Sequence, residues 1–144
     1  MNNNHLIKLQ PNKKPFLFLE DLVEVVPNEK VINEIVLNED LWFFKCHWEG
    51  DPNMPAMLQL EAMSQTASMC LFSLKNPPIK LYLVSIENAS FRKKIIPNMK
   101  IFITSFFIEN IKNLYTFKSI IREKETNSLI SKSYIKLLWP GPEK

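Results

Sequence analysis

Apolar positions along the chain follow two patterns. In residues 16–26 and 31–37, and again in residues 82–91, 100–111, 114–122 and 129–139, they are rich in β-branched and aromatic side chains and are bounded by turn residues. This composition and spacing predict strands, of which the first two form a hairpin. Between the two groups, residues 38–43 predict a short helical turn. Residues 55–73 predict one long helix, which starts at a proline and ends before Asn76-Pro77-Pro78.

The long helix is apolar on nearly every face instead of along one stripe. Its apolar residues include Met57, Leu58, Leu60, Ala62, Met63, Ala67, Met69, Cys70, Leu71 and Phe72. A helix that is apolar all round belongs in a protein core. We therefore expect an α+β domain in which a mostly antiparallel sheet of five to six strands is wrapped around one long central helix. No repeat, linker or shift in composition divides the sequence, so residues 1–144 are expected to form a single domain.

Composition and charge exclude several classes of function. A net charge of +3 is too small to indicate a nucleic-acid-binding protein. No run of 18 or more apolar residues occurs, so no membrane span is expected. The two cysteines, Cys46 and Cys70, and a polar opening without a secretory leader predict a cytoplasmic protein with free thiols and a frayed start. Neither metal-ligand spacing nor a glycine-rich phosphate loop is present, so no metal and no cofactor are expected.

The candidate chemistry lies in residues 46–65, CHWEGDPNMPAMLQLEAMSQ. This stretch contains one of the two histidines, His47, and one of the two glycines, Gly50. Glu61 is the only charged residue between Asp51 and Lys75. Because burying an ionised carboxylate without a partner is costly, we expect Glu61 either to be protonated or to sit in a polar pocket. A neutral carboxylic acid is what a general acid requires.

His47 and the start of the helix could complete such a site. An imidazole can act as a base at neutral pH. The backbone N–H groups of Ala56 and Met57 would point at a carbonyl or anionic oxygen placed before the helix. Base, acid and N–H donors together suit proton abstraction beside a thioester carbonyl, followed by loss of a hydroxyl group. Glu61 lies roughly 9 Å along the helix axis, so the spacing leaves open whether His47 reaches it within one chain or across a dimer.

Each of these residues also has a plainer interpretation. His47 could be a solvated loop histidine, and Glu61 a carboxylate satisfied by hydrogen bonds in the core. Cys46 precedes His47, but neighbouring side chains on an extended chain point to opposite sides, which disfavours a Cys–His dyad. The run Arg92-Lys93-Lys94 is most often a solvated turn, although it could also dock an acidic partner by charge steering.

The stretch HWEGDPNMPAMLQLEAMSQ resembles the signature of the bacterial 3-hydroxyacyl-(acyl carrier protein) dehydratases of the FabZ and FabA type, H-F-x-G-x-P-x-x-P-G-x-L-x-x-(E/D)-A-M-x-Q. The segments PNKKPFLFLEDLVEV and FRKKIIP resemble two further segments of that family, so the similarity extends over most of the chain. The positions that coincide in the signature are His47, Gly50, Pro52, Pro55, Leu58, Glu61, Ala62, Met63 and Gln65.

This resemblance implies a hotdog fold that works as at least a homodimer, with active sites at the subunit interface. It implies dehydration of (R)-3-hydroxyacyl thioesters, linked to acyl carrier protein, to trans-2-enoyl thioesters. His47 would be the base at C2, Glu61 the acid that protonates the leaving hydroxyl, and the amide of residue 56 a donor to the thioester carbonyl. The substrate-binding residues would be Trp48, Gly50, Ala56, Met57 and Gln65, and the carrier-docking residues would be Arg92, Lys93 and Lys94.

Several residues depart from the family pattern. Ala56 replaces a glycine and adds a Cβ where the thioester should approach. Glu49 places a charge two residues from His47, and Trp48 replaces a phenylalanine. Asn98 replaces a later glycine, but asparagine tolerates the left-handed backbone of such a turn. Two alternatives therefore stay open: a hotdog thioesterase, in which a helix carboxylate activates water and the histidine is dispensable, or a non-catalytic acyl-binding or assembly subunit.

Overall fold

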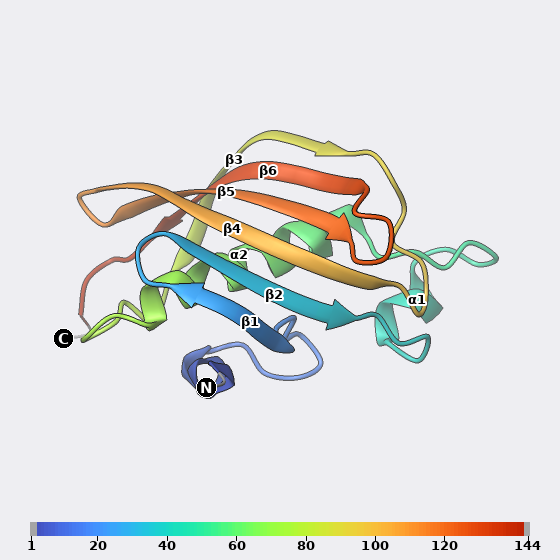
Figure 1. The fold of residues 1–144 in the computed structure, drawn as a ribbon, viewed down its shortest axis with the longest axis horizontal. Helices are drawn as coiled ribbons and strands as arrows, with labels where there is room; N and C mark the ends of the chain where they lie inside the picture. The colour runs from blue at the N-terminus through green and yellow to red at the C-terminus, as the bar shows by residue number, and fades with distance from the viewer. Residues whose placement is uncertain (1–2, 143–144) are drawn as a thin grey trace.

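The computed structural model describes residues 3–142, and its strands form one antiparallel sheet (Figure 1). The strand order is β1-β2-β4-β5-β6-β3. The strands are β1 (Asp21–Val26), β2 (Lys30–Val36), β3 (Tyr82–Phe91), β4 (Lys100–Ile111), β5 (Leu114–Glu123) and β6 (Leu129–Leu138). The helices are the 3-10 helix η1 (Asn4–Leu9) and the α-helices α1 (Trp42–Cys46) and α2 (Ala56–Phe72).

The long helix α2 lies across one face of the sheet and packs on β2, β4 and β5 (Figure 1). Every residue from position 59 to position 72 is buried except Glu61. Beneath the helix, Ser105 and Ser119 are fully buried and their hydroxyl oxygens lie 2.7 Å apart. Such small side chains let the helix pack closely on the sheet. The predicted α+β arrangement, one central helix against a six-stranded sheet, is therefore confirmed.

Asparagine takes the place of glycine in many of the turns. Within residues 3–142, the non-glycine residues with positive φ are Asn28, Asn76, Asn88, Asn98, Lys112, Asn113 and Asn127. Asparagine tolerates this left-handed conformation because its short side chain can form local hydrogen bonds. Asn98, at φ +68°, keeps the turn before β4 as its sequence context indicates. A chain with two glycines can therefore still make tight turns.

The first strand begins later than expected, at Asp21 instead of residue 16. The backbone of residues 16–20 runs beside the sheet, but side chains satisfy its hydrogen bonds. The Phe18 N–H donates to Gln65 Oε1 at 2.8 Å, and Asn33 Nδ2 donates to the Phe18 carbonyl at 3.0 Å. The prediction of a strand is wrong for residues 16–20, because buried amide side chains make the hydrogen bonds that a partner strand would make.

Two shorter segments also differ from expectation. Residues 4–9 form η1, whose Leu6 is buried, instead of a frayed start; Met1 and Asn2 lie outside the described residues. The short helix α1 begins at Trp42 instead of residue 38, because residues 38–41 form a turn in which the Leu41 N–H donates to the Asn38 carbonyl at 3.1 Å. Neither difference moves His47, which still follows the short helix.

Strand β3 is an edge strand with an unusually apolar surface. Its hydrogen-bonded neighbour in the sheet is β6. Its exposed apolar side chains are Tyr82, Leu83, Val84, Ile86 and Phe91. An exposed, apolar edge is a template on which another strand can pair. The edge therefore has the properties of an interface.

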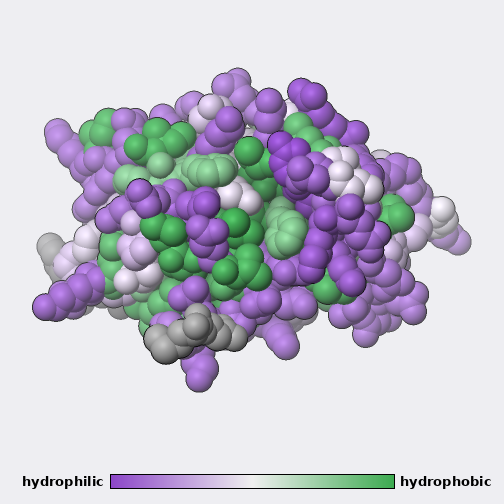
Figure 2. Space-filling model, in the orientation of Figure 1, coloured by the Kyte–Doolittle hydropathy of each residue, from purple (hydrophilic) through white to green (hydrophobic). Residues whose placement is uncertain are grey.

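Figure 2 shows the face of the sheet that points away from α2. Apolar side chains gather over the strands on this face, and hydrophilic side chains surround them. Phe106 of β4 is one of the exposed apolar residues, and it lies opposite Lys118 of β5. Within residues 3–142, no helix is both long and apolar enough to cross a membrane.

Candidate active site

The loop between α1 and α2 carries His47. The imidazole Nδ1 lies 2.9 Å from the carbonyl oxygen of Asn53, and the ring stacks on Trp48 with ring centroids 4.8 Å apart. A carbonyl oxygen only accepts hydrogen bonds, so Nδ1 carries the hydrogen of this contact. In the neutral imidazole, Nε2 then holds the free lone pair. The loop therefore presents the tautomer that a general base acting through Nε2 requires.

Gly50 gives this loop its course. Its φ is +75°, a conformation that residues with a Cβ rarely adopt. A Cβ at this position would meet nothing within 4 Å, so backbone conformation, and not lack of space, explains the glycine. At the end of the loop the buried Met54 donates its N–H to the Ile95 carbonyl at 2.9 Å. This bond ties the loop to the segment that follows β3.

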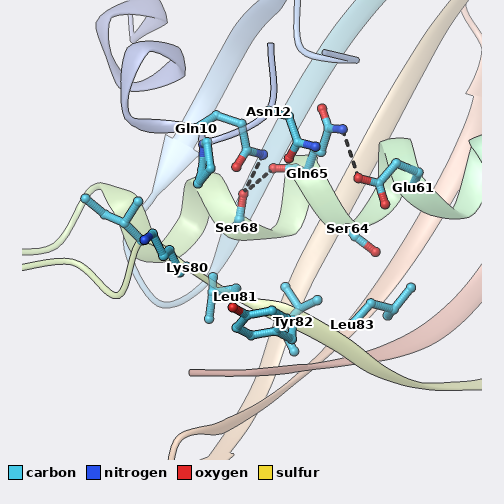
Figure 3. Close-up of a pocket in the computed structure, with 13 residues that line it drawn as sticks. Gln10, Asn12, Glu61, Ser64, Gln65, Ser68, Lys80, Leu81, Tyr82 and Leu83 are labelled. Atoms are coloured by element: carbon cyan, nitrogen blue, oxygen red, sulfur yellow. Dashed lines mark hydrogen bonds between the residues drawn. The ribbon is translucent and has the colours of Figure 1, made fainter. Parts of the chain in front are cut away.

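Glu61 lies on the wall of a cavity of about 280 Å³ (Figure 3). Helix α2 forms one side of the cavity, residues 79–83 form the other, and residues 10–12 line it as well. The helix contributes Glu61, Ser64, Gln65 and Ser68. Glu61 is half-buried there, whereas its neighbours along the helix are buried. The polar side chains on the helix side of the cavity give this carboxyl group one of the two environments that the sequence predicts.

Gln65 holds the side chain of Glu61 in place (Figure 3). Its Nε2 donates to Glu61 Oε1 at 3.1 Å and to the Phe16 carbonyl at 2.9 Å, while its Oε1 accepts from the Phe18 N–H at 2.8 Å. The side chain is only 2 % exposed. Both N–H donors of the amide and its oxygen are thus engaged by the protein itself. These bonds suit Gln65 to holding Glu61 in position, and its predicted contact with the substrate stays a prediction.

Replacing Gln65 with leucine is expected to lower the free energy of unfolding by about 2–4 kcal/mol, because backbone groups of Phe16 and Phe18 lose their partner. Gln59→Leu is the matched control. Gln59 is buried on the same helix, but among the described residues its side chain makes one hydrogen bond, from Nε2 to the Met54 carbonyl at 3.2 Å. It should cost about 1 kcal/mol or less. Urea unfolding measures both values, and equal losses would contradict the role given to Gln65.

The other predicted residues lie around the start of α2. The N–H groups of Ala56 and Met57 follow Pro55 at the helix start, and they have no recorded acceptor within residues 3–142. Trp48 and Met57 are 59 % and 71 % exposed. His47 does not line the Glu61 cavity. A single chain therefore presents the candidate base and the candidate acid at two separate places.

Two of the three basic residues that follow β3, Arg92-Lys93-Lys94, form ion pairs within the protein. Lys93 pairs with Glu123, and this hydrogen bond holds the pKa of Glu123 below its usual value. Lys94 pairs with Asp51 at 3.0 Å. Among the described residues, no partner is recorded for the guanidinium of Arg92. Of the three predicted docking residues, Arg92 is the one with an uncommitted charge.

The sequence contained a signal for this cavity that residue-by-residue reasoning missed. Glu61, Ser64, Gln65 and Ser68 are spaced i, i+3, i+4 and i+7, which places them on one face of the helix. On a helix that is mostly apolar, such a polar stripe indicates that this face lines a cavity instead of packing in the core. Asn53, in contrast, binds His47 through its backbone carbonyl. Every residue type has such a carbonyl, so the sequence could not indicate this role.

One long helix against an antiparallel sheet defines a hotdog-fold protein. Two solved structures share this architecture. The dehydratase heterocomplex ApeI:P from Xenorhabdus doucetiae has a TM-score of 0.79 at 13 % identity, with 94 % of this chain and 91 % of that chain covered. Zebra fish thioesterase superfamily member 2 has a TM-score of 0.70 at 13 % identity, with 95 % and 92 % covered. At such low identities the likeness shows the fold alone.

Sequence comparison gives the family. Residues 10–125 match the FabA-like domain, and the chain belongs to that family. It is similar to two proteins named 3-hydroxyacyl-(acyl-carrier-protein) dehydratase FabZ. The protein from Wolbachia pipientis (strain wPip of Culex pipiens) is 34 % identical over 122 residues, with 83 % of this chain and 84 % of that protein covered. The protein from Ehrlichia chaffeensis is 37 % identical over 120 residues, with 81 % of each covered. The resemblance read from residues 46–65 is confirmed.

Proposed function

We propose that this protein removes water from (R)-3-hydroxyacyl thioesters carried by acyl carrier protein and forms trans-2-enoyl thioesters. One observation carries the proposal: the only carboxylate of α2, Glu61, faces a cavity and is held there by Gln65, in a chain whose FabZ relatives are named dehydratases. In the reaction the C2–H and C3–O bonds break and a C2=C3 double bond forms. The elimination has no net oxidation, so it consumes no redox cofactor.

His47 is the proposed base. Its Nε2 would take the proton from C2, and the hydrogen bond from Nδ1 to the Asn53 carbonyl would stabilise the imidazolium that forms. The negative charge that develops on the thioester oxygen needs donors. The N–H groups at the start of α2, on Ala56 and Met57, supply donors of the kind that stabilise such an oxygen. The Cβ of Ala56 does not remove its N–H.

Glu61 is the proposed acid. Its Oε1 accepts a hydrogen bond from Gln65, so the proton that Glu61 delivers belongs on Oε2. From there it would reach the departing C3 hydroxyl, which leaves as water, while the proton from C2 stays on the histidine. The two protons therefore pass through different residues. Return of the proton from the histidine to the carboxylate, through water, would complete the cycle.

We further propose that a second copy of the chain completes each site. Tyr82 and Leu83 belong to the exposed edge strand β3 and also line the Glu61 cavity. Two copies that pair along β3 would continue the sheet and place the surface of one copy beside the cavity of the other. The partner's His47 could then act together with Glu61. This arrangement supplies the base that the cavity of a single chain lacks.

Replacing Ile86 with lysine is expected to raise the dissociation constant of the homodimer by about 10-fold or more, because a lysine on an edge strand opposes edge-to-edge pairing. Ile108→Lys is the control, since Ile108 is 47 % exposed on β4 whereas Ile86 is 39 % exposed on β3. Sedimentation velocity over a range of concentrations measures both. An equal effect of the two substitutions would argue against pairing along β3.

The carrier protein would be recognised by charge. Acyl carrier proteins are acidic partners, and Arg92, which directly follows β3, offers an uncommitted positive charge near the edge strand. Cytoplasmic location, expected from the free thiols of Cys46 and Cys70, stays a prediction. Acyl carrier protein as the natural carrier of the substrate likewise stays part of the proposal.

One assay tests the proposed function against its alternatives. The purified protein is given a 3-hydroxyacyl thioester and an enoyl thioester, and both the double bond and free thiol are followed. We expect the enoyl absorbance to rise with the 3-hydroxyacyl thioester and to fall with the enoyl thioester, with no release of free thiol in either case. Thiol release without change in the double bond would instead identify a thioesterase. Acyl binding without either reaction would identify a non-catalytic subunit.

A further inference from the structure

The loop of residues 47–55 has no regular secondary structure of its own, although it carries His47. Two contacts tie it to the segment that follows β3. One is the backbone bond from the Met54 N–H to the Ile95 carbonyl. The other is an ion pair in which Lys94 Nζ lies 3.0 Å from each carboxylate oxygen of Asp51. The loop therefore takes its position from a segment about forty residues further along the chain.

Asn53 lies between these two anchors and connects them to the histidine. Its Nδ2 donates to the Asp51 carbonyl at 2.8 Å, and its own carbonyl receives the bond from His47 Nδ1 at 2.9 Å. Asn53 is 8 % exposed, so its side chain has little freedom to move. A displacement of Asp51 is therefore passed to the carbonyl that orients the imidazole.

We propose that Lys94 is a positioning residue for His47, acting through Asp51 and Asn53, and not a docking residue for a carrier protein. The inference rests on the proposed role of His47 as the base. With Lys94 present, the Asn53 carbonyl keeps the hydrogen on Nδ1 and leaves Nε2 free. Without it, the loop relaxes and a fraction of the imidazole rings turns away or takes the other tautomer. Such a change lowers kcat more than it changes KM.

The expected effect is small, because the pair is exposed. The side chains of Lys94 and Asp51 are 61 % and 38 % exposed. The interaction in an exposed ion pair of this kind changes an equilibrium constant by about 2- to 5-fold. We therefore expect Lys94→Met to lower kcat by about 2- to 5-fold.

The test compares Lys94→Met with Lys30→Met on a 3-hydroxyacyl pantetheine thioester, a substrate without a carrier protein. Lys30 forms a comparable exposed pair with Glu24 at 3.1 Å, but in the β1–β2 hairpin. Both variants lose one positive charge, and only Lys94→Met loosens the loop. Lys94→Met should lose turnover and Lys30→Met should keep it. The charge swap Asp51→Lys with Lys94→Asp should restore most of the loss.

Nitrogen-15 NMR of the His47 imidazole provides a readout that does not need activity. The wild type and Lys30→Met should show the hydrogen on Nδ1, and Lys94→Met should show a mixture of tautomers. If the wild type has no dehydratase activity, the proposed function fails while this spectrum still tests Lys94. Unchanged tautomers in Lys94→Met would overturn the inference. So would a loss of rate that appears only with carrier-linked substrate, because that result would identify a docking role.

Discussion

Substituting His47 with alanine is expected to lower the rate of dehydration by about 10²- to 10⁴-fold, the range that general acid–base groups contribute. The loss arises because the substitution removes the imidazole that is proposed to accept the proton from C2. The rate is measured from the absorbance of the enoyl thioester. Within residues 3–142 the imidazole makes one hydrogen bond, to the Asn53 carbonyl, so the fold should survive the substitution.

The other histidine of the chain provides the control for this experiment. His5 lies on η1 and is exposed. His5→Ala should therefore leave turnover unchanged, and circular dichroism should show the same fold for both variants. Full activity of His47→Ala would exclude the histidine as the base.

Replacing Glu61 with glutamine is expected to reduce dehydration by a similar factor, about 10²- to 10⁴-fold. The amide oxygen of the new side chain can still accept the hydrogen bond from Gln65, so the positions of the surrounding groups are kept. What is lost is the proton on the second oxygen, which the leaving hydroxyl needs. The same absorbance assay measures the rate, and urea unfolding should show a stability close to that of the wild type. Retained turnover would exclude Glu61 as the acid.

Mixing the two inactive variants tests whether the site spans two chains. If His47 of one copy serves the other copy's Glu61, a dimer of one His47→Ala chain and one Glu61→Gln chain has one intact site. After exchange of subunits in an equal mixture, about a quarter of the wild-type activity should return, as expected for a symmetric dimer with two equivalent sites. No recovery, with exchange shown by mass spectrometry, would place base and acid in the same chain.

The elements that bury apolar surface were predictable from sequence. Helix α2 was expected at residues 55–73 and spans Ala56–Phe72, and the strands of the second half of the chain differ from their expected bounds by a residue or less at each end. These segments are long and strongly patterned, so their period decides their structure. His47 and Gly50 stood out because the chain has only two histidines and two glycines, and Glu61 stood out because it is the only charged residue between Asp51 and Lys75.

Contacts between distant parts of the chain were not predictable in this way. Residues 16–20 have the composition of a strand, but Gln65 and Asn33 take the hydrogen bonds that a strand would make. Lys94 looks like any solvated lysine until the fold brings Asp51 to it. Local propensity cannot decide such pairings, because they depend on where segments many residues apart come to lie.

The bond between Gln65 and Phe18 also makes the backbone a reporter of the site. The same amide that receives the Phe18 N–H holds Glu61, so a change at the carboxyl group shifts the electron density around one identifiable amide proton. In the folded protein that proton is buried and should exchange with deuterium slowly. Binding of an acyl chain beside Glu61 should slow its exchange further. A ligand, or a variant that loosens the acid, can therefore be detected at Phe18 without any turnover.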